Sequence, residues 1–405
     1  MAEKKPANKM LLIMEENMII GILKEIMQGE RRVAGTPETV KKMVETGAAV
    51  LVETKAGDAS FYSDDAYLEA GAILVDDPEA IYERAEVILK VKEPRFNHNK
   101  NKHEIDMMHP GQYLITFIHP AAPANHELVS RMAEKGIIGL TLDGVPRISR
   151  AQTMDALSSM SACAGYKGMI MAIDEISKFV PPMASAVGML RPATVLVVGA
   201  GVAGLRAVAT AKSLGAAVYA ADIRPEACEQ AKSLGARIID LGVPAAVAVS
   251  ADRKYASSLS EEWLTVERKN LEEKIAQADI VFLSALVPGK LSPIIVTETM
   301  VKAMMPGSCI VDISIDQGGN CEITPPGAKE IRHGVMIIGI KNIPGMIPTS
   351  STWMFAHNVY NLLTYITKKD KIELDINDEI VASILVTKDG KILHAGALEA
   401  MGASQ

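Results

Sequence analysis

The stretch TVLVVGAGVAGLRAVATAKSLGAAVYAADIRPE, residues 194–226, is the strongest signal of fold in this chain. Its β-branched beginning predicts a buried strand over Thr194–Val198. Gly199, Gly201 and Gly204 then follow as GxGxxG at the start of a predicted helix. In this order, backbone amides and a helix N-terminus can meet a pyrophosphate, so the stretch predicts a dinucleotide-binding βαβ unit.

The acidic end of the next predicted strand indicates which dinucleotide is bound. Asp222 ends that strand, where its carboxylate can accept both ribose hydroxyls and repel a 2′-phosphate. This predicts NAD(H), although Arg224 is a residue type that accommodates a 2′-phosphate. The predicted cofactor-binding residues are Gly199, Gly201, Val202, Ala203, Gly204, Asp222, Ile223, Arg224, Leu286 and Val287.

Short strand-like runs alternate with helical stretches along the chain, and they form two series. This alternation is typical of parallel sheets built from βαβ units. The first series is expected at Met18–Leu23, Ala49–Glu53, Ala72–Val75, Val87–Val91, Tyr113–Phe117 and Ile137–Leu140. The second is expected at Thr194–Val198, Ala217–Ala221, Arg237–Asp240, Ile280–Leu283, Cys309–Ile313 and Val335–Ile340.

The predicted fold is therefore α/β, with two Rossmann-like, doubly wound parallel-sheet domains joined by long helices. A helical stretch over 150–179 and a Pro-rich join over 180–192 separate the two series. The region after Pro344 has a helix near Trp353–Ile366 and two short strands, too little for a third core. We therefore expect a disordered extension (1–17), a discontinuous first domain (18–149 with 345–405) and an NAD(H)-binding domain (150–344).

Composition excludes several function classes. The 405 residues carry a net charge of −7 with no basic stripe, so nucleic acid is not an expected partner. The four cysteines have no CxxC spacing and the histidines have no HExxH spacing, so no metal is assigned. Continuous apolar runs are too short for a membrane span.

From Met18 onward, the order of motifs resembles the family that unites alanine dehydrogenases with the alpha subunit of proton-translocating nicotinamide nucleotide transhydrogenase. The matching motifs are RRVAGTPE, VKEP, PRISRAQTMDALSS, GAGVAGL, ALVPGK and DISIDQGGNCE. The chain carries features of both branches of this family.

The stretch VPRISRAQTMDALSSMSACAGYKG is similar to the soluble NAD(H)-binding component of transhydrogenase. This resemblance implies that Arg147, Gln152 and Asp155 face the nicotinamide, whereas the residues alone also fit a solvated helix start. The insertion 245–274 resembles the mobile loop that folds over NAD(H) in transhydrogenases; an ordinary surface excursion is the alternative.

Other polar residues match the alanine dehydrogenase branch. Lys92 and His119 follow neighbouring predicted strands, and parallel strands would bring both to one carboxyl edge. The resemblance implies that Arg32 clamps a substrate carboxylate, Lys92 holds the substrate, His119 is the acid/base and Asp316 orients water. Oxidising an amine requires such proton transfers, whereas hydride transfer between two nicotinamides requires none.

Three hypotheses follow. The first is the NAD(H)-binding component of a transhydrogenase. As the resemblance implies, it would be a homodimer at the inner face of the cytoplasmic membrane, with a membrane subunit and an NADP(H)-binding subunit as separate chains. The second is a cytoplasmic NAD-dependent amino-acid dehydrogenase, hexameric in many alanine dehydrogenases. The third is a non-enzymatic NAD(H)-binding sensor that kept the fold.

Overall fold

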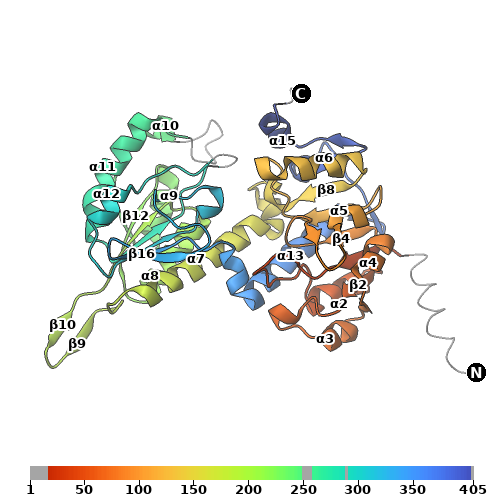
Figure 1. Ribbon diagram of the computed structural model, residues 1–405, viewed down its shortest axis with the longest axis horizontal. Coiled ribbons are helices and arrows are strands. Elements are labelled where there is room, and N and C mark those ends of the chain that lie inside the picture. Colours follow the sequence, from red (N-terminus) through yellow and green to blue (C-terminus); the bar gives the residue numbers. More distant parts are fainter. Residues whose placement is uncertain (1–16, 249–257, 288–290, 403–405) are drawn as a thin grey trace, which may run out of the picture. The chain divides into compact units, whose positions relative to one another are not determined.

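The computed structural model describes residues 17–248, 258–287 and 291–402 (Figure 1). The chain divides into two compact units: Met1–Met160 with Ile347–Gln405, called here the first unit, and Ser161–Met346, the second unit. The expected N-terminal extension lies outside the described residues except for Asn17.

A seven-stranded sheet forms the centre of the second unit. Its order is β13-β12-β11-β14-β15-β17-β16, parallel except for the edge strand β16. The strands are β11 Thr194–Val198, β12 Ala217–Ala221, β13 Arg237–Ile238, β14 Ile280–Leu283, β15 Cys309–Asp312, β16 Lys329–Arg332 and β17 Val335–Ile338. The six parallel strands have the 3-2-1-4-5-6 order of a dinucleotide-binding fold, so the predicted fold class is confirmed.

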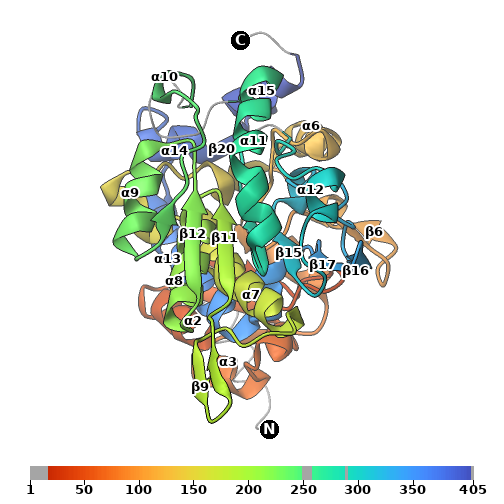
Figure 2. The same cartoon turned by 90° about the vertical axis from the view of Figure 1, so that its left-hand side faces the viewer.

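Alternate side chains of these strands enter two separate cores, as period-two geometry requires. Val195 and Val197 pack with α7, α8 and α9 on one face, while Leu196 and Val198 pack with α11 and α12 on the other. The helices are α7 Ala156–Glu175, which begins in the first unit, α8 Val202–Ser213, α9 Pro225–Ser233, α10 Ala245–Ala248, α11 Glu261–Gln277 and α12 Glu298–Lys302. Figure 2 looks toward the second unit, with β11 and β12 side by side.

An eight-stranded sheet forms the centre of the first unit, in the order β21-β20-β8-β7-β4-β1-β2-β3. The strands are β1 Ile19–Ile22, β2 Ala49–Glu53, β3 Ile73–Val75, β4 Val87–Leu89, β7 Tyr113–Thr116, β8 Ile138–Thr141, β20 Leu385–Lys388 and β21 Lys391–Ile392. The six earlier strands are parallel, and the C-terminal hairpin β20–β21 adds to β8 antiparallel. Two small hairpins accompany the sheet, β5 Phe96–Asn97 with β6 Lys102–His103 and β18 Thr367–Lys368 with β19 Lys371–Ile372.

Several helices of the first unit begin at a residue whose side chain caps them. Thr36 caps α2 and exchanges hydrogen bonds with Thr39, while Pro37 occupies the first turn, where no amide partner is needed. The helices are α2 Pro37–Glu45, α3 Asp64–Glu69, α4 Pro78–Arg84, α5 Glu104–Met107, α6 His126–Glu134, α13 Pro348–Ile366, α14 Glu379–Ile384 and α15 Ala395–Ala400. Short 3-10 turns of this unit are η1 Asp58–Ser60, η2 Pro123–Asn125, η3 Leu142–Gly144 and η4 Ser149–Met154, and those of the second unit are η5 Ile315–Gln317 and η6 Ile343–Met346.

The structure corrects several local predictions. The insertion 245–274, expected to be a loop, instead begins with α10 and ends inside α11; residues 249–257 lie outside the described residues. The Pro-rich join contains a hairpin, β9 Met183–Ser185 and β10 Gly188–Leu190. The stretch 150–179, expected to be one helix, is η4 followed by α7.

No helix in the part of the chain that the structure describes is long and apolar enough to cross a membrane.

Candidate functional site

The glycine turn between β11 and α8 has the shape of a phosphate cradle. Gly199 has a φ of +89°, and a Cβ there would lie 2.7 Å from the Ala285 nitrogen. A Cβ on Gly204 would lie 1.9 Å from the Gly199 oxygen, so helix and turn touch. Above Gly201 the nearest atom to a Cβ would be Arg224 Nη2 at 3.9 Å. Two glycines therefore close the turn and the third leaves its backbone open, which fits a dinucleotide pyrophosphate.

Asp222 and Arg224, beyond β12, form an internal ion pair. Arg224 Nε and Nη2 donate to the two Asp222 oxygens at 3.0 and 2.8 Å. The same carboxylate accepts the amides of Ala200 at 2.7 Å and Arg224 at 2.8 Å. The pairing with Asp222 raises the pKa of Arg224, against the opposing effect of partial burial. The predicted ribose acceptor is therefore present, and its oxygens already have four donors.

Leu286 and Val287 lie just beyond β14, on a segment held by a buried asparagine. Asn320 accepts the Ala285 amide at 2.9 Å and donates to the Ala285 oxygen at 2.8 Å, as a neighbouring strand would. It also donates to the Pro293 oxygen at 2.9 Å. The sequence prediction missed Asn320, whose position in the GGNCE motif was the available signal. The next residues of ALVPGK, 288–290, lie outside the described residues.

A second region, in the first unit, brings together the three residues expected to face the nicotinamide. Arg147, Gln152 and Asp155 line a cavity of about 290 Å³ together with Pro146, Ser158 and Ser159. Asp155 accepts the Ser158 amide at 2.8 Å and its hydroxyl at 2.6 Å, and thereby caps the first turn of α7. The carboxylate thus holds the helix start, as the simpler interpretation predicted, and it also faces the cavity.

The η4 turn that carries Gln152 is fixed to the helices of the same unit. Asn358 of α13 donates to the Thr153 oxygen at 2.8 Å. Arg150 Nη1 lies 2.8 Å from the Asp378 carboxylate and 2.9 Å from the Tyr365 hydroxyl. The exposed Gln152 side chain is therefore presented by a firmly held backbone.

At the carboxyl edge of the first sheet, His119 pairs with an aspartate. His119 Nδ1 lies 2.7 Å from Asp143 Oδ1, and the His119 amide donates to Asp143 Oδ2 at 2.7 Å. Thr141 also donates to this carboxylate at 2.6 Å. Partial burial opposes protonation of His119, but Asp143 outweighs it and raises the pKa of the imidazole. The sequence prediction missed Asp143, although it follows the next predicted strand at the same edge.

Lys92 and Arg32 also belong to this edge, but they differ in their surroundings. Lys92 is half-buried, and its charge partly offsets the effect of Asp143 on His119. Arg32 is buried, and its guanidinium faces Glu30 with Nε–Oε1 and Nη2–Oε2 distances of 2.7 and 2.5 Å. Burial would raise the pKa of Glu30, but Arg32 lowers it. The structure therefore gives Arg32 a carboxylate partner, Glu30, that sequence reasoning did not foresee.

Beneath this edge lies a buried cluster around Lys90. Lys90 Nζ contacts Glu104 Oε1 at 2.8 Å and Glu25 Oε2 at 3.6 Å. Burial would lower the pKa of Lys90, but the two carboxylates raise it. Burial raises the pKa of Glu25 to about 7, despite the nearby lysine. The Glu25 carboxyl also accepts the Val91 amide at 2.6 Å, so the cluster fixes the backbone leading to Lys92.

Asp316 belongs to the second unit, on η5, where it is exposed. The loop behind it is organised by the buried Asp312, which accepts from the Asn320 amide at 2.8 Å, the Cys321 amide at 3.0 Å and the Thr324 hydroxyl at 2.9 Å. Arg32, Lys92 and His119 therefore belong to one unit and Asp316 to the other.

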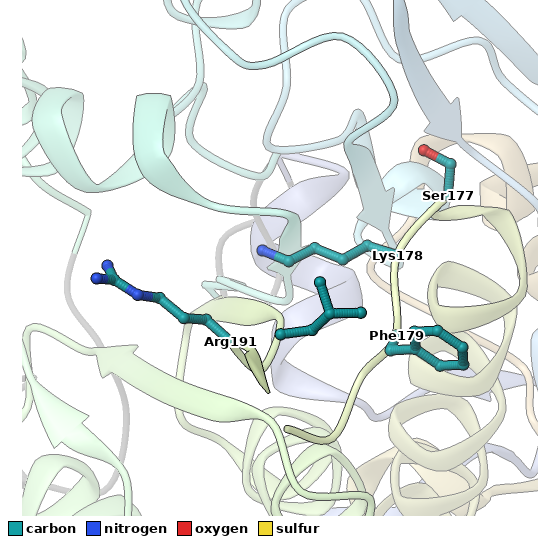
Figure 3. A pocket seen from close by; sticks show the side chains of 5 residues that line it. Ser177, Lys178, Phe179 and Arg191 are labelled. Carbon is teal, nitrogen blue, oxygen red and sulfur yellow. The ribbon is translucent and has the colours of Figure 1, made fainter. Parts of the chain in front are cut away.

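A larger cavity in the second unit contains none of the predicted site residues. It measures about 540 Å³ and lies at the base of the β9–β10 hairpin (Figure 3). Its lining consists of Ser177, Lys178, Phe179, Leu190 and Arg191. Within the described ranges, no cluster of three potential metal ligands is found. The four cysteines are free thiols.

Comparison with known proteins identifies related sequences. Residues 21–164 match the family model described as alanine dehydrogenase/PNT, N-terminal domain, and residues 168–395 match that of the C-terminal domain. A Rhodospirillum rubrum protein, named as the first part of NAD(P) transhydrogenase subunit alpha, is 38% identical over 95% of this chain and 100% of its own length. The NAD(P) transhydrogenase subunit alpha of Cereibacter sphaeroides is 40% identical over 93% of this chain and 71% of its own.

Alanine dehydrogenase is a more distant relative. The Bacillus subtilis enzyme is 30% identical over 95% of both chains. Among solved structures, the transhydrogenase from Sinorhizobium meliloti aligns with a TM-score of 0.79 at 37% identity, covering 92% of this chain and 99% of that one.

Proposed function

The chain belongs to the alanine dehydrogenase/PNT family, and from that membership we propose that it is the NAD(H)-binding component of an NAD(P) transhydrogenase. It is thus an NAD-dependent oxidoreductase, as predicted from the sequence. The proposed reaction is direct hydride transfer between NADH held by this chain and NADP held by a partner chain.

The single observation that carries this proposal is the sequence identity to transhydrogenase alpha subunits. The chain is 38% identical to the Rhodospirillum rubrum protein and 40% identical to the Cereibacter sphaeroides subunit, against 30% for the Bacillus subtilis alanine dehydrogenase. The membrane-spanning part and the NADP(H)-binding part are proposed as separate partner chains. The location proposed for the assembly is the inner face of the cytoplasmic membrane.

The proposed roles of the residues follow from what each can donate or accept. The amides around Gly201, including those of Val202 and Ala203, would hold the pyrophosphate at the start of α8. Asp222 would accept the ribose hydroxyls, with Ile223 and Arg224 beside it and Leu286 and Val287 in the segment beyond β14. Bound NAD(H) supplies the hydride. Gln152 would bind the nicotinamide amide, while Arg147 and Asp155 order the surrounding loop.

This proposal is tested by measuring binding and hydride transfer separately. The purified chain should bind NADH by fluorescence titration, yet reduce NADP only after the membrane and NADP-binding chains are added. Gln152→Ala should slow transfer at least about tenfold. Thr153→Ala is the matched control, because Thr153 serves the turn through its backbone oxygen. NADH binding without transfer in the complete assembly would contradict the proposal.

A second candidate, an NAD-dependent amino-acid dehydrogenase, is favoured by the pair of His119 and Asp143. Asp143 holds the imidazole and raises its pKa, as expected of an oriented acid/base beside Lys92. The assay is NADH formation from NAD and a panel of small L-amino acids at alkaline pH. Turnover by the chain alone that disappears in His119→Ala would establish this function and refute the transhydrogenase proposal.

We further propose that the chain forms a homodimer through the β9–β10 hairpin. Val187 is fully exposed and Met189 is 76% exposed, and a projecting apolar ribbon of this kind is typical of association surfaces. Light scattering should give twice the mass of one chain. Met189→Asp should weaken the dimer, whereas the same change at the exposed Leu393 of the first unit should not. A hexamer would instead favour the dehydrogenase candidate.

A further inference from the structure

At the ribose end of the proposed dinucleotide site, the two predicted residues, Asp222 and Arg224, do not by themselves repel a 2′-phosphate. Asp222 is paired with Arg224 through two hydrogen bonds, so together they carry no net charge. A neutral pair does not repel a 2′-phosphate, and a guanidinium with a planar fork attracts one. Asp222 alone therefore does not explain a preference for NAD(H) over NADP(H).

A third charged group of the second unit, Glu267, interacts electrostatically with Asp222. Glu267 is on α11, and it occupies the same helix face as Leu271 and Ile275, the face that packs onto the sheet. That packed cluster includes Ala221, which immediately precedes Asp222. Glu267 is only 4% exposed, so its carboxyl belongs to the interior and not to the outer surface of the helix.

We propose that Glu267 is the residue that sets the preference of this site for a dinucleotide without a 2′-phosphate. The inference rests on the proposed dinucleotide-binding function. With Glu267 ionised, the corner formed by Asp222, Arg224 and Glu267 carries one net negative charge, which repels a phosphate dianion in a poorly hydrated environment. With Glu267 protonated, the corner is neutral and Arg224 is able to receive the 2′-phosphate.

The charges around Glu267 make this preference depend on pH. Burial, together with the charge of Asp222, raises the pKa of Glu267 to about 7, and Arg268 opposes the shift. Arg268 itself donates to the Ile294 oxygen at 2.7 and 3.0 Å, and Arg224 is bound to Asp222. Discrimination against NADPH should therefore be strong above pH 7 and weak below it.

The test is the ratio of the Kd values for NADPH and NADH, measured by fluorescence titration of the full chain at pH 6 and pH 8.5. In the wild type the ratio should rise about tenfold between these pH values, the scale of one charge–charge interaction. In Glu267→Gln it should stay low at both. The 2′-phosphate of NADPH titrates in the same way in the experiments with the wild type and with Glu267→Gln. The difference between their Kd ratios therefore isolates the contribution of the Glu267 side chain.

Glu272→Gln, an exposed position on the same helix, is the matched control and should behave as wild type. Arg224→Leu in the Glu267→Gln background should remove the gained NADPH affinity. If wild type and Glu267→Gln bind NADH but have the same ratio at both pH values, the inference is wrong while the proposed function stands. If the folded wild type binds neither dinucleotide, both are wrong.

Discussion

The two candidate regions are built in opposite ways. The cradle of the second unit is made mainly of backbone: Gly199 and Gly204 let the turn and helix touch, and Gly201 leaves the backbone open. The carboxyl edge of the first unit is made of charged side chains, nearly all engaged with one another, such as His119 with Asp143. A site made of backbone is disturbed by small changes in the shape of the turn. The properties of a site made of charged side chains depend instead on which groups are paired. Substitutions in the two regions should therefore have different consequences.

The largest expected effect is at the buried charge cluster of the first unit. Lys90→Met would leave the Glu25 and Glu104 carboxyls without their cation, so the free energy of unfolding of this unit should fall by about 3–5 kcal/mol. Urea denaturation measures it. Lys102→Met, at the exposed pair with Glu79, is the control and should cost less than about 1 kcal/mol. Equal losses would mean that the cluster does not stabilise this edge.

Substitutions at two glycines of the cradle should affect stability and NADH binding separately. Gly204→Ala places a Cβ 1.9 Å from the Gly199 oxygen, and should destabilise the second unit by about 2–3 kcal/mol, seen as a lower Tm. Gly201→Ala meets no atom closer than 3.9 Å, so the Tm should not change. Its Kd for NADH should nevertheless rise about tenfold, because the methyl group occupies the proposed pyrophosphate position. If Gly201→Ala binds NADH as the wild type does, the glycine turn does not hold the pyrophosphate.

The buried Glu25 should make stability depend on pH. Its folded pKa is about 7, above the value of 4.5 expected in the unfolded chain. The folded state therefore binds this proton more tightly, and the resulting stability is complete below pH 4.5 and is lost as pH rises through 7. Relative to Glu25→Gln, the wild type should lose about 2–3 kcal/mol over this range in urea denaturation. Glu45→Gln, at an exposed site, should leave the pH profile unchanged.

The smallest effect should be on the titration of one histidine. Asp143 raises the pKa of His119, so Asp143→Asn should move its titration to lower pH, as measured by NMR of the ring protons. In the dehydrogenase candidate, the acidic limb of the pH–rate profile should move in the same direction. Asp106→Asn, near Arg131 on the same unit, should leave His119 unchanged. If the pKa of His119 is the same in the wild type and in Asp143→Asn, the contact between the two residues only holds the loop in place.

Much of the fold was predictable because its signals are local. The strands β2, β11, β12 and β14 have the predicted bounds, and the cap at Thr36 was recognisable from the residue types around Pro37. The errors occurred where local signals are ambiguous. A polar, Lys- and Glu-rich stretch proved to be α11, because Glu267, Leu271 and Ile275 recur on one buried face, a pattern with only one apolar residue per turn. Edge strand β16 was missed, because its exposed polar residues resemble a loop.

The parallel α/β architecture, the glycine turn and the acidic residue after β12 could all be predicted from the sequence, because their signals come from residues adjacent along the chain. Which charges neutralise one another could be seen only from the folded positions of the side chains. Arg224 folds back onto Asp222, and Asp143 reaches His119 from the next strand. Ion pairing depends on distances of a few ångströms between side-chain atoms. Residue types along the chain do not encode those distances, either for Asp222 and Arg224, two residues apart, or for the more distant His119 and Asp143.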